Sequence, residues 1–374
     1  MNQSILKLGI IALSSTLAAC GSDTETVDSS GRSGADTANY SDLDATQGRA
    51  YLDLESGHSV TSTDQWHFSY QKYVGFSING GISGDAGIAS CIAHIPEGIY
   101  DVNGAPVQSA FEALTRDNTQ ADFDAVTATN CTADFAEDSI DLQIDMENWL
   151  AADYSAGAPV FSASSDASNG WIIQSASKND SDIYEYARVK VSTVDYSAGV
   201  KRAITLESEI WDDNASVFLS AVTSPELNFT DNRVYWDMET NSIVTADQNW
   251  DLSIVVDERN WNIQVNGGVS GEGSAAVATL LVDSASQVSD PASGTTGDVY
   301  KYYSDSASSV LSGPGNYGAF SYGVDDSHNM WPNFTTYLFK DGTRYYKAQI
   351  VSNYGEDGTA SSGNLYVRYA EITE

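Results

Sequence analysis

Positive charge is scarce in this sequence. Only 17 Lys and Arg stand against 52 Asp and Glu, which gives a formal net charge of −35 at pH 7. Nucleic acids and anionic membrane surfaces attract basic proteins, so this balance argues against both as partners. We interpret the excess as a solvating acidic coat rather than as a docking face for a basic partner.

Recognisable catalytic motifs are also missing. The sequence contains no hydrolase nucleophile elbow, no phosphate-binding loop and no HExxH zinc motif. Catalysis by two carboxyl groups needs surroundings that separate their pKa values, and no acidic pair stands in a predictably apolar stretch. We therefore expect a binding protein rather than an enzyme.

Cysteine is limited to three residues. An apolar run over residues 8–13 is too short to cross a bilayer, and the LAAC that ends at Cys20 resembles the lipobox of bacterial lipoprotein precursors. This resemblance implies a signal peptide over residues 1–20 and acylation of Cys20. Because no Asp follows Cys20, it also implies an outer-membrane, surface-facing protein that meets the membrane only through its lipid anchor. In such an exported protein, Cys91 and Cys131 are expected to form a disulfide.

Against these shortages stands a regular alternation between Trp250 and Val265. Apolar residues occupy every second position in two runs, which is the pattern of strands with one buried face. The polar residues 257–260 between the runs predict a hairpin turn. The sequence NGGVSG from Asn266 then predicts a loop in which glycines allow close backbone approach.

The same pattern occurs earlier in the chain. Trp66 lies 184 residues before Trp250, and the NGGISG sequence at Asn79 lies 187 residues before NGGVSG at Asn266. One unit is thus written twice, at a spacing that indicates duplicated domains rather than a solenoid. The sequence predicts a flexible tether over residues 21–44 and two tandem related domains over residues 45–212 and 213–374.

Strand patterns dominate the rest of the chain. Further alternation predicts strands over residues 140–146, 186–192, 203–210 and 300–303. A short helix is predicted around residues 106–116, and the Ser-, Asp- and Gly-rich residues 283–315 are predicted to be mainly loops. The expected fold class is therefore all-β or mostly β, with long loops and little helix.

The repeated motif is joined near the C-terminus by KDGTRYYK at residues 340–347 and GNLYVRYAEI at residues 363–372. Together these sequences resemble the HmuY family of bacterial haem-binding lipoproteins. The resemblance implies a hemophore-like protein that binds haem and delivers it to an uptake receptor, such as a TonB-dependent outer-membrane receptor. The alternative is a non-enzymatic surface binding or adhesion module that has lost haem ligation.

Haem binding needs an apolar slot and an axial ligand such as imidazole or thioether. The family pattern places a ligand histidine about five residues after the strand-opening tryptophan, where this chain has Gln71 and Val255. The candidate ligands are two histidines near the first hairpin and a His–Met pair in a later loop: His67, His94, His328 and Met330. No EF-hand spacing is present, so no metal beyond haem iron is expected.

Overall fold

The computed structural model describes residues 38–155, 157–178 and 184–373. The fold is mostly β, with 45% strand and 7% helix, which confirms the predicted fold class. The helical elements are short: α1 (Gln108–Ala113), α2 (Gln120–Ala125), α3 (Met146–Trp149) and the 3-10 turns η1 (Ala285–Gln287) and η2 (Val310–Ser312). Helix α1 lies where a helix is predicted, and it buries Phe111.

Strands from both ends of the chain share one antiparallel sheet of order β1-β27-β26-β25-β6. Its strands are β1 (Asn39–Asp44), β6 (Ala89–His94), β25 (Thr336–Asp341), β26 (Arg344–Ser352) and β27 (Asn364–Glu371). A second sheet of order β3-β2-β4-β5 is built from β2 (Ala50–Asp53), β3 (His58–Val60), β4 (Phe68–Gln71) and β5 (Gly75–Ile78). Both sheets contribute to one buried cluster, the terminal core, which includes Phe68, Phe339 and Val367.

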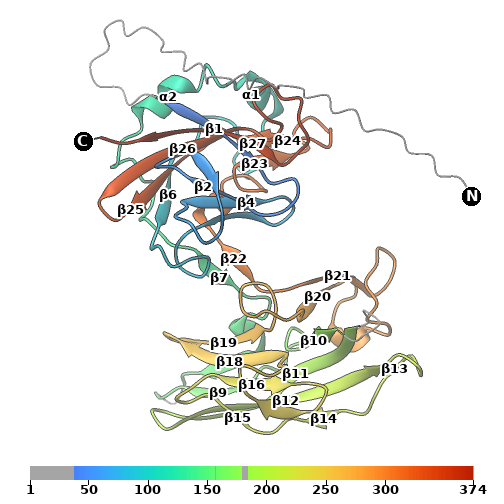
Figure 1. Ribbon diagram of the computed structural model, residues 1–374. Coiled ribbons are helices and arrows are strands. Elements are labelled where there is room, and N and C mark those ends of the chain that lie inside the picture. Colours follow the sequence, from blue (N-terminus) through green and yellow to red (C-terminus); the bar gives the residue numbers. More distant parts are fainter. Residues whose placement is uncertain (1–37, 156, 179–183, 374) are drawn as a thin grey trace, which may run out of the picture. The chain divides into compact units, whose positions relative to one another are not determined.

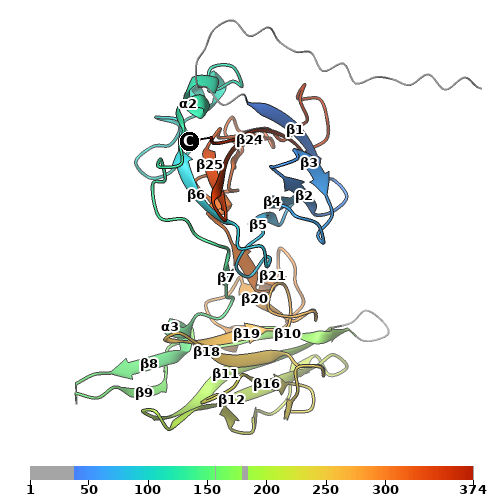
Figure 2. The same cartoon turned by 60° about the vertical axis from the view of Figure 1, so that its left-hand side comes forward.

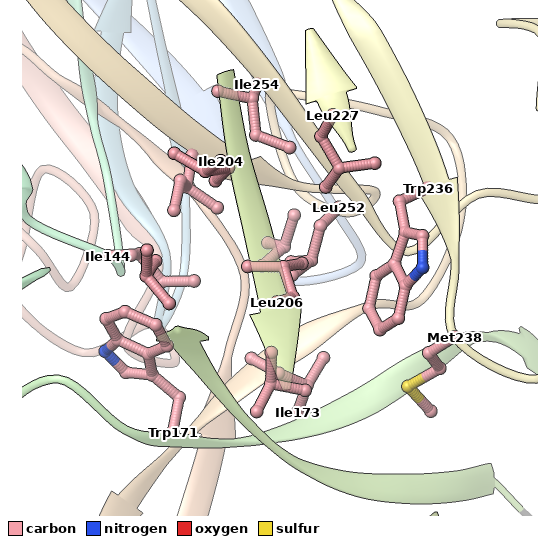
Figure 3. Packing of buried hydrophobic residues seen from close by; sticks show 14 of the residues in the cluster. Ile144, Trp171, Ile173, Ile204, Leu206, Leu227, Trp236, Met238, Leu252 and Ile254 are labelled. Carbon is pink, nitrogen blue, oxygen red and sulfur yellow. The ribbon is translucent and has the colours of Figure 1, made fainter. Parts of the chain in front are cut away.

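The middle of the chain forms a separate cluster, the middle core. Its larger sheet has the order β13-β12-β11-β10-β20-β21, and β14 and β15 also pair with β12. These strands are β10 (Trp171–Lys178), β11 (Tyr184–Ser197), β12 (Lys201–Asp212), β13 (Val217–Phe218), β14 (Val222–Thr223), β15 (Leu227–Asn228), β20 (Ala276–Leu280) and β21 (Val299–Tyr303). A four-stranded sheet β17-β16-β18-β19 faces the same core and consists of β16 (Val234–Asp237), β17 (Ser242–Val244), β18 (Leu252–Asp257) and β19 (Asn260–Val265). Figure 3 shows how Trp236 and Leu252 from this small sheet meet Ile173 and Leu206 from the larger one.

Strand pairing crosses the boundary that the sequence repeat predicts at residues 212 and 213. The terminal core joins residues 43–88 to residues 311–369, whereas the middle core lies entirely within residues 144–277. In Figures 1 and 2 the blue strands β1–β6 accordingly lie with the red strands β25–β27, and the green strands lie with the yellow ones. The first hairpin sheet thus packs with the last strands of the second copy. We name residues 38–138 and 306–373 the terminal region and residues 139–305 the middle region.

Short strand pairs complete the fold. Strand β7 (Ser139–Asp141) pairs with β22 (Ser306–Ser308), so the two connections between the terminal and middle regions bond to each other. Strand β8 (Leu150–Asp153) pairs with β9 (Val160–Ala163), and β23 (Phe320–Tyr322) pairs with β24 (Met330–Pro332). The last of these pairs lies beside the candidate site described below.

The predicted hairpin over residues 250–265 is confirmed. Strands β18 and β19 pair from Leu252 opposite Val265 to Asp257 opposite Asn260. The turn residue Glu258 has a positive φ of 53°. Leu252, Ile254, Ile263 and Val265 are fully buried because the alternation places them on the face that packs on the middle core.

The repeated NGG sequences have a structural role. The Asp138 carboxylate accepts a hydrogen bond from the Ile78 amide at 3.0 Å, and the Asp305 carboxylate accepts one from the Val265 amide, also at 3.0 Å. At Gly81, with φ of +63°, an added Cβ would lie 2.0 Å from the Asp138 carbonyl oxygen. Each glycine loop is therefore held by an aspartate at the start of a connection between the regions, and a side chain at Gly81 would break that contact.

Two sequence predictions are wrong in detail. Residues 39–44 are not part of a tether, because β1 pairs with β27 and buries Leu43 completely. Residues 140–146 are not one strand: β7 ends at Asp141, and Met146 begins α3. Ile144 is nevertheless buried in the middle core, so its apolar character reflects packing rather than strand pairing.

Candidate functional site

His67 is fully buried immediately before β4. Its ring packs edge-on against Tyr346, with the ring centroids 4.6 Å apart. Nδ1 lies 3.1 Å from both the Leu54 amide nitrogen and an Asp53 oxygen, and Nε2 lies 3.8 Å from an Asp341 oxygen. Burial lowers the pKa of His67, and the two carboxylates oppose this effect. His67 is therefore enclosed by polar and aromatic groups of the protein itself.

His94 ends β6 in the five-stranded sheet, beside the other end of β25 from the residue that His67 contacts. It is paired with Thr336, the first residue of β25, and its Nε2 is 3.6 Å from an Asp122 oxygen. His67 contacts Asp341, the last residue of β25. Five residues of strand span about 16 Å at a rise of about 3.3 Å per residue. The structure therefore does not bring His67 and His94 together around one iron.

The two remaining cysteines form the predicted disulfide between Cys91 and Cys131. The bond lies in a small cluster with Val126 and Leu338. The expected lipidation residue, Cys20, lies outside the described residues, as does the whole expected signal peptide. Within the described part of the chain, no helix has the length and apolar character needed to cross a membrane.

The structure does bring His328 and Met330 close to a third side chain, that of Tyr322. Tyr322 and Met330 stand opposite each other in the β23–β24 pair. The Tyr322 hydroxyl and His328 Nδ1 share a hydrogen bond of 2.7 Å, and the two rings stack with centroids 6.1 Å apart. The partly buried Met330 is fixed by its amide, which donates to the Tyr354 hydroxyl at 2.9 Å. A phenol with an imidazole partner thus neighbours a thioether.

Tyr322 and Met330 line a cavity of about 520 Å³, which we name the tyrosine groove. This volume lies within the range of about 300–1,000 Å³ that is usual for small-molecule sites. The lining residues are Tyr70, Lys72, Tyr73, Val74, Gly75, Phe76, Ser312, Asn316, Tyr317, Gly318, Tyr322, Met330 and Ser362. The groove is therefore rich in aromatic rings and has one lysine on its wall.

Several of these rings face solvent. Tyr73, at the tip of the β4–β5 hairpin, is 94% exposed, and the adjacent Val74 is 62% exposed. Tyr317 and Tyr322 pack edge-on with ring centroids 5.9 Å apart. Exposed aromatic faces beside an apolar cavity suit a flat apolar ligand. By contrast, burial and the neighbouring tyrosines raise the pKa of Tyr70 to about 12, so its phenol is neutral at pH 7.

Sequence reasoning does not find Tyr73, Tyr317 or Tyr322. These residues lie in a hairpin turn and in short irregular strands, where no apolar period marks them. One available signal is the glycine- and tyrosine-rich GNYGAFSYG at residues 315–323. Aromatic residues without a strand pattern to bury them are candidates for a binding surface.

The middle region contains a cluster of three carboxylates in place of a histidine. Asp251 is buried and accepts hydrogen bonds from the amides of Met238 at 2.8 Å and Ala176 at 2.7 Å. Oxygens of Asp237, Glu239 and Asp251 lie within 4.8 Å of one another. Glu239 is exposed as a residue, but desolvation of its carboxyl group, followed by the charge of Asp251, raises its pKa to about 8, and burial also raises the pKa of Asp251. Because backbone amides already satisfy Asp251, this cluster is explained without a cation.

No protein-family model matches this chain, and no curated protein matches it either. The likeness to haem-binding lipoproteins therefore rests on the residues quoted from the sequence, and the choice of site rests on the geometry of the groove.

Proposed function

We propose that this chain is an outer-membrane lipoprotein that binds haem in the tyrosine groove and passes it to an uptake receptor. The observation that supports the proposal is the Tyr322–His328 hydrogen bond of 2.7 Å at an aromatic cavity of about 520 Å³. The role is one of binding rather than catalysis. Delivery to a TonB-dependent receptor follows from the resemblance in sequence alone.

The donor set of the groove fits haem iron. Phenolate oxygen and thioether sulfur are both known classes of axial ligand. In this arrangement Tyr322 would bind the iron through its oxygen, and His328 would accept the phenol proton through the hydrogen bond that it already makes. Haem supplies a flat apolar face, which the exposed rings of Tyr73 and Tyr317 can cover.

Two further side chains complete the fit. Met330 lines the groove opposite Tyr322 in the β-ladder, where its sulfur is available as a soft contact or second ligand. The Lys72 ammonium lies 5.0 Å from the centre of the Tyr73 ring, at the hairpin tip. In a chain with so few cations, Lys72 is the lining residue suited to pair with a haem propionate.

A hemin titration of the purified protein tests the proposal. We expect a sharpened, red-shifted Soret band together with the visible charge-transfer band of a ferric phenolate. Tyr322→Phe removes the ligand oxygen and keeps the ring, so the charge-transfer band should vanish and affinity should fall at least tenfold. His328→Gln should weaken the band less.

Matched controls separate this site from the other candidates. Tyr300→Phe changes an exposed tyrosine of the middle region, and His94→Ala removes a candidate ligand outside the groove. Both variants should bind hemin as the parent protein does. A spectrum that hemin leaves unchanged would instead favour the alternative, a surface binding module without haem. Equal bands in Tyr322→Phe and the parent would exclude Tyr322 as the ligand.

A further inference from the structure

A second cavity, of about 570 Å³, is polar and is lined by residues of the terminal region together with Val269 of the middle region. Its floor lies on the β2-β4-β5 sheet, whose strands are adjacent in Figure 2. Its lining includes Arg49, Tyr51, Trp66, Ser69 and Ser77, together with Ser62, Thr63 and Gln65. None of the residues that line the tyrosine groove also lines this cavity. The two sites are therefore separate and can be tested separately.

Arg49 places a positive charge in this cavity. One terminal nitrogen of its guanidinium donates to the hydroxyls of Ser69 at 3.0 Å and Ser77 at 3.2 Å. Among the described residues, no carboxylate lies within 4.0 Å of the guanidinium. Burial lowers the pKa of Arg49, although the group remains charged at neutral pH. The Asp138 carboxylate acts on the half-buried guanidinium electrostatically, but among the described residues no carboxylate forms an ion pair with Arg49.

The middle region contains the same framework with a larger side chain beside the arginine. Tyr235 and Trp250 pack edge-on with centroids 5.1 Å apart, as Tyr51 and Trp66 do. Arg233 donates to Ser253 at 2.9 Å, which matches the bond from Arg49 to Ser69.

The difference lies on the next strand. Ser77 pairs with Ser69, whereas Gln264 pairs with Ser253 and its side-chain oxygen accepts from Arg233. In the terminal region Ser77 also accepts from Arg49, at 3.2 Å, but its side chain is shorter, and both residues line the cavity. In the middle region the longer side chain of Gln264 supplies the corresponding oxygen to Arg233.

We propose that this cavity binds a small hydroxylated carboxylic acid, of the class of the sugar acids. The guanidinium of Arg49 forms a fork that matches a carboxylate, and Ser77 is a smaller neighbour for it than Gln264 is for Arg233. The hydroxyl and amide groups of Ser62, Thr63 and Gln65 on the rim provide partners for sugar hydroxyls. The nearby Asp64 carboxylate is engaged by the Thr61 amide at 2.9 Å and the Thr61 hydroxyl at 2.7 Å, so it stabilises a turn.

The chain itself supplies the test variant. Ser77→Gln copies the residue that stands at the equivalent position of the middle region, so it is expected to fold. Calorimetric titration of the full chain with sodium galacturonate should show saturable binding. Ser77→Gln and Arg49→Gln should each weaken that binding at least tenfold. Methyl galactoside, which lacks the carboxylate, and acetate, which lacks the hydroxyls, should each bind at least tenfold more weakly.

Two controls complete the experiment. Gln264→Ser should leave galacturonate binding at the Arg49 cavity unchanged, and hemin binding should be the same in Ser77→Gln and the parent protein. The proposal is overturned if the folded parent does not bind galacturonate or if Ser77→Gln binds it equally well. Equal binding of methyl galactoside would also overturn it, because the carboxylate would then have no role.

Discussion

The segment 139–305 contains its own core, and the residues on either side of it form a second core together, an arrangement that we call nested. We therefore predict that residues 139–305 fold alone. The domains predicted from the sequence repeat, 45–212 and 213–374, should not fold independently. Excising residues 139–305 leaves the middle core complete, because its members lie within residues 144–277. The excision removes the pairing of β7 with β22, which joins three residue pairs. At about 0.5–1.5 kcal/mol for each hydrogen bond, the loss amounts to about 3 kcal/mol.

Excising the predicted second domain, residues 213–374, removes far more stabilising contacts than excising residues 139–305. It separates β16, β18 and β19 from β10, β11 and β12, which supply the other half of the middle core. The missing side chains include Ile173, Val189, Ile204 and Leu206, all buried. Each is worth about 1.5–3 kcal/mol when buried, so these four alone approach the entire stability of an ordinary domain, about 5–15 kcal/mol.

Thermal and urea unfolding followed by circular dichroism distinguish the two divisions. Residues 139–305 should unfold in one cooperative transition with a defined midpoint, and tryptophan fluorescence should report the same midpoint. Residues 213–374 should give no cooperative transition. A folded 213–374 fragment together with an unfolded 139–305 fragment would refute the nested arrangement.

Three further predictions concern single sites. Replacing Cys91 and Cys131 together by alanine opens a loop of 40 residues, and should lower the free energy of unfolding by up to about 4 kcal/mol in a urea titration. Because the folded-state pKa of Glu239 is raised to about 8, the folded protein binds more protons than the unfolded chain above the usual carboxyl range. Stability should therefore fall as the pH rises toward 8, and Glu239→Gln should flatten that fall. Gly81→Ala should lower the melting temperature more than Gly98→Ala, because both glycines have positive φ but only Gly81 faces a carbonyl oxygen at 2.0 Å from its added Cβ.

Each of these predictions has an outcome that would contradict it. An unchanged urea midpoint in the double cysteine variant would mean that the disulfide constrains little. A stability profile of Glu239→Gln that parallels the parent from pH 5 to pH 8 would remove Glu239 as the source of the slope. Equal melting temperatures for Gly81→Ala and Gly98→Ala would show that the loop yields easily to a side chain.

Local pattern carries much of the fold in this sequence. The alternation of Trp250 to Val265 predicts both strands of the β18–β19 hairpin and their turn, because each depends only on neighbouring residues. The strand predicted at residues 300–303 is also present, as β21. The period of the apolar residues shows which side chains are buried. In these elements the buried side chains also lie on paired strands, so the sequence predicts the strands correctly.

The local pattern does not determine which large sheet each hairpin sheet packs against. Strand β11 contains residues 186–192 and strand β26 contains residues 346–352, and these segments match at a spacing of 160 residues. Both therefore offer a similar apolar face to either hairpin sheet. A repeated pattern specifies the type of neighbour but not which copy supplies it. The candidate site is missed for a related reason, since Tyr73 and Tyr322 lie where no period exists.

We infer that buried polar residues determine which of the two large sheets, that of β11 or that of β26, each hairpin sheet packs against. His67 in the terminal region and Asp251 in the middle region are equivalent, and each approaches the backbone amide of the matching residue, Leu54 or Met238. The pairing of Phe339 with Tyr346 matches that of Gln174 with Tyr186, but beyond Gln174 the middle-region ladder shifts register before Lys178 pairs with Tyr184. His67 faces the Asp341 carboxylate, whereas Asp251 accepts the Ala176 amide. The opposite pairing would set Asp251 against Asp341, and two partly buried carboxylates repel.

A double-mutant cycle in the intact chain tests whether residues 67 and 341 select the partner sheet. His67→Asp places a carboxylate beside both Asp53 and Asp341, and should lower the free energy of unfolding by about 2–4 kcal/mol at neutral pH. Asp341→Ala alone should cost less than about 1 kcal/mol, because Asp341 is partly exposed. In the His67→Asp background, Asp341→Ala should restore part of the lost stability. Additive effects of the two changes would mean that the pair at residues 67 and 341 does not select the partner, and that the nested arrangement is chosen by apolar packing alone.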